Sequence, residues 1–251
     1  MEIENIEFSY GNHKVLDNIS FKVMEGGITT IIGANGCGKS TLFNVMTKNL
    51  KPQKGRVLLN GRNIADIPLK GFAKQVAIVH QYNTAPSDIT VEKLISYGRI
   101  AYGGFKRNHD EDEKCIKFAM EVTGVSEFSQ KQISALSGGQ RQRVWIAVAL
   151  AQNTKILLLD EPTTYLDVRY QIEILRLIRK LNEKYGITII MVLHDINQSI
   201  AYSNRIIAMK DGKIVAEGIP DEIINEELIK NVYGIELSVK EVESNKIVLT
   251  V

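Results

Sequence analysis

The chain has 251 residues, of which 44% are hydrophobic and 24% charged, a composition typical of a globular protein. This length suits one large domain, or one domain with an inserted subdomain. With 31 Lys and Arg against 29 Asp and Glu, the formal charge is +2, so the chain as a whole has no general attraction for nucleic acid.

The cysteines and the apolar segments limit where the protein can work. Cys37 and Cys115 form no spaced framework, which predicts free thiols and a reducing compartment. The N-terminus lacks a basic stretch followed by an apolar core, so no signal peptide is expected. The longest apolar runs, such as 187–193, are too short to span a bilayer. Any role at a membrane is therefore expected to be peripheral, through a partner.

The first 32 residues favour β-structure. Apolar residues lead to a turn at Tyr10-Gly11-Asn12 and alternate at period two after it, at 19, 21 and 23. A β-branched run at 28–32 predicts a buried strand. From its own context, Tyr10 would be an ordinary turn tyrosine, although its ring could stack on a planar base.

Residues Gly33–Ser40 match the pattern G-x-x-x-x-G-K-[ST] at every fixed position, and a helix is expected from Thr41. A strand, a glycine turn and a helix N-terminus gather backbone N–H groups around one spot, which favours an anion with several oxygens. We therefore predict a nucleoside triphosphate site. Lys39 would supply a positive charge for the β- and γ-phosphates, and the Ser40 hydroxyl would hold Mg²⁺.

The middle of the chain changes from strand to helix. Strands are expected at 57–59 and 76–79, with a turn at Asn60-Gly61 between them, and the second strand leads to Gln81. From about residue 84 to about residue 155 the pattern is helical.

Several residues mark where helices begin and end within this segment. Thr90 is a suitable N-cap, Gly103-Gly104 marks a break, and Asp110–Glu113 lie where a helix N-terminus favours negative charge. Gly124 is suited to end that helix. We therefore expect an α-helical insertion in an α/β domain.

An apolar strand at 156–161 ends in two carboxylates, Asp160 and Glu161. The carboxyl ends of parallel strands are where α/β sheets place ligand sites. Asp160 suits the water shell of Mg²⁺, and Glu161 could orient and deprotonate an attacking water. His194 ends a later apolar strand that should belong to the same parallel sheet.

The remainder of the chain is predicted to contain both helices and strands. A long helix is expected at 168–184, ended by Gly186, and a hairpin turn at Asp211-Gly212. A helical patch at 221–233 and two strands follow.

Residues Leu136–Gln140 spell LSGGQ, the signature of ABC-type ATPases. The phosphate loop, Gln81, this signature, the strand ending in Asp160-Glu161, Leu166-Asp167 and His194 occur in that family's order and at similar spacing. The chain therefore resembles an ABC ATPase along essentially its whole length. The resemblance implies an α/β P-loop NTPase core with an N-terminal antiparallel β subdomain. It also implies a single domain, 1–251, with an inserted α-helical subdomain at 84–155 that carries the signature.

The resemblance implies a role for each matching residue. Glu161 would be the general base, and His194 would contact the γ-phosphate and hold Glu161. Lys39 and Gln81 would complete the catalytic set, and Mg²⁺ would be held by Ser40, Gln81 and Asp160. Tyr10 would stack on adenine, and Asp167 would couple two sites. ATP would be bound by Tyr10, Asn35, Gly36, Cys37, Gly38, Lys39, Ser40, Thr41, Ser137, Gly138, Gly139, Gln140 and Asp167.

In this family the signature serves the nucleotide of a second subunit, so two ATP molecules lie between two chains arranged head to tail. The γ-phosphate closes the homodimer, and hydrolysis releases it.

The segments around the shared motifs look most similar to importers of iron–siderophores, haem and cobalamin. These segments are Ser96–Arg99, Gln140–Ala147, Thr163–Asp167 and Val192–Gln198. The resemblance implies an ATPase subunit on the cytoplasmic face of the membrane, bound to integral permease subunits. An extracytoplasmic substrate-binding protein would be an indirect partner, and no nucleic acid is expected. A permease helix would dock near Gln81 and residues 84–105.

Three other classes remain open. A soluble ABC ATPase of nucleic-acid maintenance would usually have a coiled coil or zinc-bearing insertion between the phosphate loop and the signature, and neither pattern occurs here. The sequence argues less strongly against an ATPase of iron–sulfur cluster assembly than against one of nucleic-acid maintenance. An exporter is disfavoured because no membrane domain is fused to the chain.

Cys37 occupies a variable position of the phosphate loop. Its place at an anion-favouring helix start predicts a lowered thiol pKa and protection from thiol reagents by bound nucleotide. The alternative is an unreactive small residue.

Overall fold

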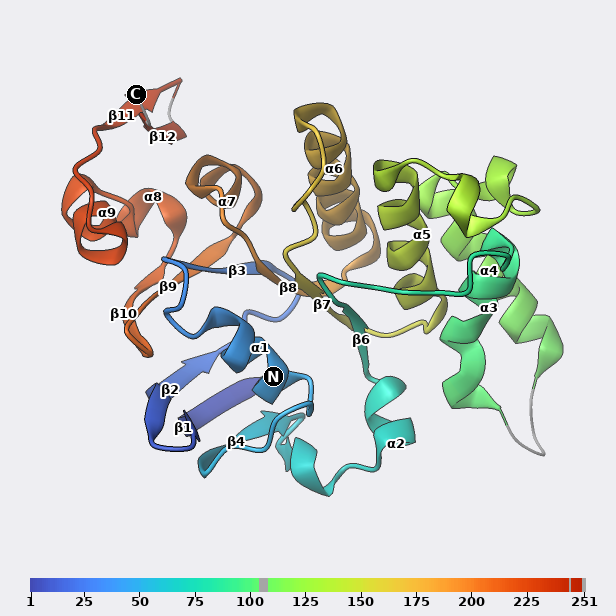
Figure 1. Ribbon diagram of the computed structural model, residues 1–251, viewed down its shortest axis with the longest axis horizontal. Helices are drawn as coiled ribbons and strands as arrows, with labels where there is room; N and C mark the ends of the chain where they lie inside the picture. Colours follow the sequence, from blue (N-terminus) through green and yellow to red (C-terminus); the bar gives the residue numbers. More distant parts are fainter. Residues whose placement is uncertain (104–107, 244, 250–251) are drawn as a thin grey trace. The chain divides into compact units, whose positions relative to one another are not determined.

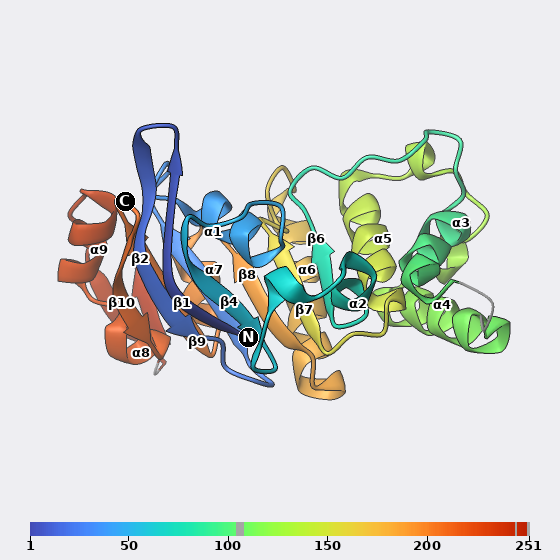
Figure 2. The same cartoon turned by 90° about the horizontal axis from the view of Figure 1, so that it is seen from below.

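Figures 1 and 2 show the computed structural model, which describes residues 1–103, 108–243 and 245–249. The chain divides into two compact parts. The terminal part comprises residues 1–67 and 188–251, and the central part comprises residues 68–187. Among the described residues, no helix is long and apolar enough to cross a membrane.

The terminal part begins with an antiparallel sheet in the order β2-β1-β4-β5. Figure 2 shows β2, β1 and β4 side by side. Its strands are β1 (Glu2–Tyr10), β2 (His13–Lys22), β4 (Lys54–Leu59) and β5 (Arg62–Asn63). Ile3, Ile6 and Phe8 of β1 are buried, and an irregularity at Asn5 (φ 50°) lets Ile3 and Ile6, three residues apart, both face the core. The Asn60-Gly61 turn leads into β5, a two-residue strand too short to show any periodicity in the sequence.

The second sheet of the terminal part has the order β10-β9-β3-β8. Its strands are β3 (Ile28–Gly33), β8 (Thr188–Val192), β9 (Arg205–Lys210) and β10 (Lys213–Gly218). Every residue of β3 and β8 is buried, as expected for parallel strands covered on both faces. β3 runs parallel to both β8 and β9, so the chain leaves β3 and β8 at the same edge.

The rest of the terminal part consists of short helices and a small hairpin. These are α1 (Lys39–Met46), η1 (Ile64–Asp66), α7 (Ile196–Tyr202), α8 (Pro220–Ile223), α9 (Glu226–Tyr233), β11 (Val239–Val242) and β12 (Asn245–Val248). Ile200 of α7, Ile224 directly after α8 and Ile229 of α9 pack with Ile32 of β3 and Ile206 of β9. Through this core the C-terminal helices pack against β3, the strand that leads into the phosphate loop.

The expected tail helix at 221–233 is two helices, because the Asn225 side chain caps a new one by accepting from the Leu228 N–H at 2.8 Å. The Asn197 side chain exchanges two hydrogen bonds with the Val248 backbone, at 2.8 and 3.0 Å. These bonds fasten β12 to α7.

The central part contains two parallel strands, paired from Val76↔Ile156 to Val79↔Leu159, and a larger set of helices. Its elements are α2 (Leu69–Ala73), β6 (Val76–Val79), α3 (Val91–Ser96), η2 (Tyr97–Tyr102), α4 (His109–Thr123), η3 (Ser126–Phe128), η4 (Ile133–Ala135), α5 (Gly138–Ala151), β7 (Ile156–Asp160) and α6 (Val168–Tyr185). The described elements between residues 84 and 155 are all helical. That residues 84–155 form a separate subdomain stays a prediction.

Caps predicted in the central part are confirmed. The Thr90 hydroxyl accepts from the Lys93 N–H at 3.3 Å, and Gly124 and Gly186 end α4 and α6 in the left-handed conformation. The acidic run Asp110–Glu113 lies in the first turns of α4. Of the predicted break at Gly103-Gly104, Gly103 follows η2, and residues 104–107 lie outside the described residues.

Arg99, in one of the segments that resemble the siderophore importers, is almost completely buried. It donates to Asp112 at 2.7 Å and to the Ala151 carbonyl at 3.0 Å, and its guanidinium lies 3.8 Å from the centre of the Tyr102 ring. A buried charge needs such partners, so Arg99 serves to join η2, α4 and α5.

Candidate functional site

The phosphate loop of the terminal part makes the turn between strand and helix that its glycines predict. β3 ends at Gly33, and the chain turns through Gly36 (φ 80°) and Gly38 (φ 105°) into α1. A Cβ atom on Gly33 would collide with the Met209 carbonyl oxygen, and one on Gly38 would lie 2.9 Å from the Val15 carbonyl oxygen. Side chains are therefore excluded at both positions by packing as well as by backbone conformation.

Lys39 is held inside this loop. Its side chain donates to the Gly33 carbonyl at 2.7 Å and the Ala34 carbonyl at 3.0 Å, and the residue is only 5% exposed. Ser40 and Asn35 are exposed beside it. Phosphate oxygens entering the loop would replace these neutral carbonyls as partners of the ammonium, which strengthens each bond because both partners are then charged.

His194 follows β8, and β8 is the parallel neighbour of β3 with Ile31 opposite Val192. The phosphate loop and His194 therefore leave the same edge of one sheet, which confirms that prediction. His194 is exposed, and the next residue, Asp195, caps α7 by accepting from the Gln198 N–H at 2.7 Å. This cap determines where the chain turns after the histidine.

Tyr10 lies at the end of β1, beside the turn to β2. The residue is 53% exposed, and its ring packs edge-on against Phe8, with centroids 4.9 Å apart. One aromatic neighbour thus supports the ring while leaving much of its surface accessible for stacking.

In the central part, the ends of β6 and β7 bring together Gln81 and Glu161. The Gln81 amide nitrogen donates to Glu161 Oε2 at 2.5 Å, and the Thr164 hydroxyl donates to the same oxygen at 3.1 Å. The predicted strand at 156–161 ends one residue early, because Glu161 adopts φ 49°. Glu161 and Asp160 are each 9% exposed, so both carboxylates lie in a largely dry environment.

The signature begins α5. The Ser137 hydroxyl accepts from the Gln140 N–H at 3.3 Å, and the Gln140 side chain accepts from the Ser137 N–H at 2.9 Å. This reciprocal capping starts the helix at Gly138. A Cβ atom on Gly139 would collide with the Tyr170 ring, whereas Ser137 and Gly138 are exposed. The signature thus presents an accessible helix N-terminus, which favours an anion.

Asp167 caps α6 by accepting from the Tyr170 N–H at 3.0 Å. Leu166, the residue before it, lies 3.5 Å from a Cβ position on Gly138. The signature and Asp167 are therefore neighbours within the central part.

Sequence patterns do not indicate the contact of Thr164 with Glu161 or the pair of tyrosines next to it. Thr164 binds the Glu161 carboxylate directly, and beside this contact the hydroxyls of Tyr82 and Tyr165 lie 2.7 Å apart. Only position in the sequence could have indicated a role for these residues. Tyr82 follows Gln81, and Thr164 and Tyr165 lie between Glu161 and Asp167.

The prediction of a lowered Cys37 pKa is wrong. The thiol is buried, and its sulfur lies 2.6 Å from a Cβ position on Gly33. This burial raises the pKa of Cys37 by more than the nearby Lys39 charge lowers it. Protection by nucleotide stays a prediction.

We expect Cys37 to react with iodoacetamide about tenfold more slowly in the folded chain than in urea at pH 7.5, because a raised pKa leaves less thiolate. The rate should rise as the pH approaches the raised pKa. Mass spectrometry of a Cys115→Ser chain measures this rate, with Cys37→Ser as the control for residual labelling. Equal rates in both states at pH 7.5 would contradict the account.

Oxygen donors suited to Mg²⁺ occur among the predicted site residues. Ser40 offers a hydroxyl, Gln81 an amide carbonyl and Asp160 a carboxylate, and hard cations prefer these ligand types. Because the Gln81 amide nitrogen is bonded to Glu161, its carbonyl oxygen is the atom suited to the metal.

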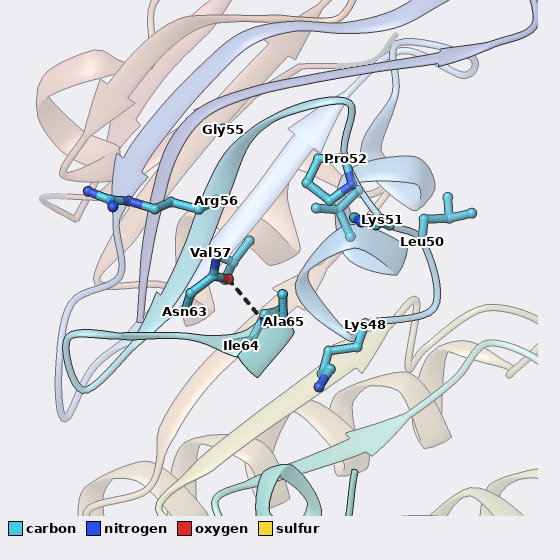
Figure 3. Close-up of a pocket in the computed structure, with 11 residues that line it drawn as sticks. Lys48, Leu50, Lys51, Pro52, Gly55, Arg56, Val57, Asn63, Ile64 and Ala65 are labelled. Atoms are coloured by element: carbon cyan, nitrogen blue, oxygen red, sulfur yellow. Dashed lines mark hydrogen bonds between the residues drawn. The ribbon is translucent and has the colours of Figure 1, made fainter. Parts of the chain in front are cut away.

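A pocket of about 330 Å³ in the terminal part lies outside this set of residues (Figure 3). Its walls come from Val45, Lys48, Leu50, Lys51, Pro52, Gly55, Arg56, Val57, Asn63, Ile64 and Ala65. Two of its cations have protein partners, since Lys48 donates to the Ile67 carbonyl and Arg56 to Glu4 at 2.7 Å. None of the predicted site residues lines it.

Comparisons with known proteins agree with the motifs. The model of the ABC transporter family matches residues 16–164. The iron(3+)-hydroxamate import ATP-binding protein FhuC of Bacillus subtilis is 45% identical over 240 residues, covering 95% of this chain and 89% of that protein. The ferric enterobactin transport ATP-binding protein FepC of Escherichia coli is 43% identical, covering 92% and 86%. The dimeric structure of MJ0796, a bacterial ABC transporter cassette, has a TM-score of 0.76 and 30% identity, covering 87% of this chain and 98% of that one.

Proposed function

Because this chain belongs to the ABC transporter family and is one of its ATPase cassettes, we propose that it drives the import of iron–siderophore complexes. Two relatives support this substrate class, one described as importing iron(3+)-hydroxamate and the other as transporting ferric enterobactin. Each is matched over more than nine-tenths of this chain, including the segments outside the shared motifs. Haem and cobalamin are the alternative substrates.

In this proposal the terminal part binds the nucleotide. Tyr10 stacks on adenine, and residues Asn35–Thr41 enclose the phosphates with backbone N–H groups. Lys39 transfers its hydrogen bonds from the Gly33 and Ala34 carbonyls to the β- and γ-phosphates. His194 contacts the γ-phosphate from the neighbouring strand end.

Glu161 is the proposed general base. It takes a proton from water as the water oxygen attacks the γ-phosphorus, and the bond to the β–γ bridging oxygen breaks to release ADP and phosphate. The contact between Gln81 and Glu161, at 2.5 Å, is the observation that carries this assignment, because it fixes one carboxylate oxygen. Mg²⁺, held by Ser40, Gln81 and Asp160, would neutralise charge on the phosphates.

We further propose that each site is completed by Ser137, Gly138, Gly139 and Gln140 of a second copy in a head-to-tail homodimer. The exposed helix N-terminus at Ser137 supports this, because one chain already surrounds its phosphates with its own loop. Asp167, beside the signature, would connect the two sites. Two such chains would bind integral permease subunits at the cytoplasmic face, supplied by an extracytoplasmic binding protein.

Uptake by proteoliposomes tests the transport assignment. The chain would be reconstituted with a candidate permease and its binding protein, and ⁵⁵Fe-labelled ferric hydroxamate uptake measured with and without ATP. We expect ATP-dependent uptake that Glu161→Gln abolishes. Uptake of haem or cobalamin alone would refute the substrate class. Absence of ATP-dependent uptake, together with failure of the chain to bind any permease, would refute transport and favour a soluble ATPase of cluster assembly.

A further inference from the structure

Two exposed tyrosines of the central part lie beside the proposed general base. The side chains belong to Tyr82, which is 69% exposed, and Tyr165, which is 78% exposed. Their hydroxyls are 2.7 Å apart, and their ring centroids are 6.1 Å apart at an angle of 38°. This hydrogen bond raises the pKa of Tyr82 above its ordinary value.

The tyrosine contact is one of two side-chain links described here between the same two segments, the other being the Gln81–Glu161 bond. Gln81, directly before Tyr82, donates to Glu161, and Thr164, directly before Tyr165, donates to the same carboxylate oxygen from within its own segment. The Asn83 side chain donates to the His80 carbonyl at 2.5 Å and closes the turn that carries Gln81 and Tyr82. The segments after β6 and β7 are thus joined by the Gln81–Glu161 bond and by the tyrosine contact next to it, and each segment has an internal bond of its own.

The backbone of the second segment needs such support. Glu161 and Tyr165 both have positive φ, 49° and 65°, which is uncommon for large side chains and costs free energy. The local backbone bonds are long, with the Thr164 N–H to the Glu161 carbonyl at 3.2 Å and the Leu166 N–H to the Thr163 carbonyl at 3.4 Å. A strained conformation of this kind persists only when several surrounding contacts require it.

We propose that Tyr82 and Tyr165 are positioning residues for ATP hydrolysis, whose hydroxyl contact keeps the Gln81 amide on the Glu161 carboxylate. The inference rests on the proposed role of Glu161 and adds two residues that act through it. Losing the contact lets the two segments move apart, so Glu161 spends less time oriented toward water. Nucleotide affinity depends on the terminal part and is expected to change little.

Phenylalanine substitutions remove each hydroxyl and keep each ring. We expect Tyr82→Phe and Tyr165→Phe each to lower kcat about threefold to tenfold, the loss typical of one hydrogen bond. The KM for ATP should stay within about twofold, because only an orientation important in the transition state is lost. The double variant should lose no more than either single variant, since both remove the same bond.

The measurement is steady-state hydrolysis of Mg²⁺-ATP by the full chain, with Tyr97→Phe as a matched control. Tyr97 is also an exposed tyrosine of the central part, and its variant should keep the wild-type kcat. Unfolding curves check that all variants fold equally well. This separates positioning from stability, because a purely structural role would lower the unfolding midpoint and leave kcat per folded molecule unchanged.

Several results would overturn the inference. One is a wild-type kcat in both single variants, and another is a loss of kcat in the double variant equal to the product of the two single losses. A third is a raised KM for ATP with unchanged kcat, which would assign the tyrosines to binding. The proposed function is judged separately by Glu161→Gln. If the wild type hydrolyses ATP and Glu161→Gln does not, while both tyrosine variants keep full activity, only the positioning role is wrong.

Discussion

A Glu161→Gln chain is expected to bind ATP as tightly as the wild type while hydrolysing it at least about a hundredfold more slowly, the usual contribution of a general base. The amide has nearly the same shape and still accepts from Gln81 and Thr164, so the contacts seen at 2.5 and 3.1 Å can remain. It cannot take a proton from water. ATP should therefore stay intact, and a closed dimer should accumulate.

Phosphate release and light scattering measure the two effects in one preparation. Glu127→Gln is the matched control, because Glu127 is an exposed glutamate of the same central part and should behave as the wild type. Hydrolysis by Glu161→Gln at a near wild-type rate would remove Glu161 from the role of base.

The second large effect is expected for Lys39→Ala, which should weaken ATP binding about a hundredfold, as when one partner of a buried charge pair is lost. Lys39 is 5% exposed and already held by two carbonyls of its own loop, so its ammonium is in place before the phosphates arrive. Without it the phosphates keep the backbone N–H groups but lose their nearest cation.

Fluorescence of a labelled ATP analogue gives the affinity. Lys51→Ala is the control, since Lys51 is an exposed lysine beyond the end of α1. An unfolding curve is needed as well, because the carbonyls of Gly33 and Ala34 lose a partner in the variant. Unchanged ATP affinity in a folded Lys39→Ala chain would contradict the assignment.

The sequence predicts those features of the fold that depend on local pattern. The buried strand at 28–33, the glycine turn and the helix beyond it all have strong signals, as do the caps at Thr90 and Gly124. The shared edge of the phosphate loop and His194 was also predictable, because both follow apolar strands of a parallel sheet.

Features that arise from tertiary packing were not predictable. The thiol pKa of Cys37 depends on burial against Gly33, which outweighs the loop charge that the sequence displays. The Tyr82–Tyr165 contact joins residues 83 positions apart and leaves no periodic trace. β5 has only two residues, too few for any pattern.

The central claim is that one active site combines the phosphate loop of one chain with the signature of another. Mixing two inactive variants tests it, Lys39→Ala in one chain and Gly138→Glu in the other. Gly138 is exposed at the start of α5, where a negative charge suits the helix but repels a phosphate. A chain carrying both changes, mixed with either single variant, is the control, because no such pair contains an intact site.

We predict that each variant is inactive alone and that their mixture hydrolyses ATP, since one of the two sites then has a normal Lys39 and a normal Gly138. A mixture that stays inactive, or a Gly138→Glu chain that hydrolyses ATP at the wild-type rate by itself, would contradict the shared site.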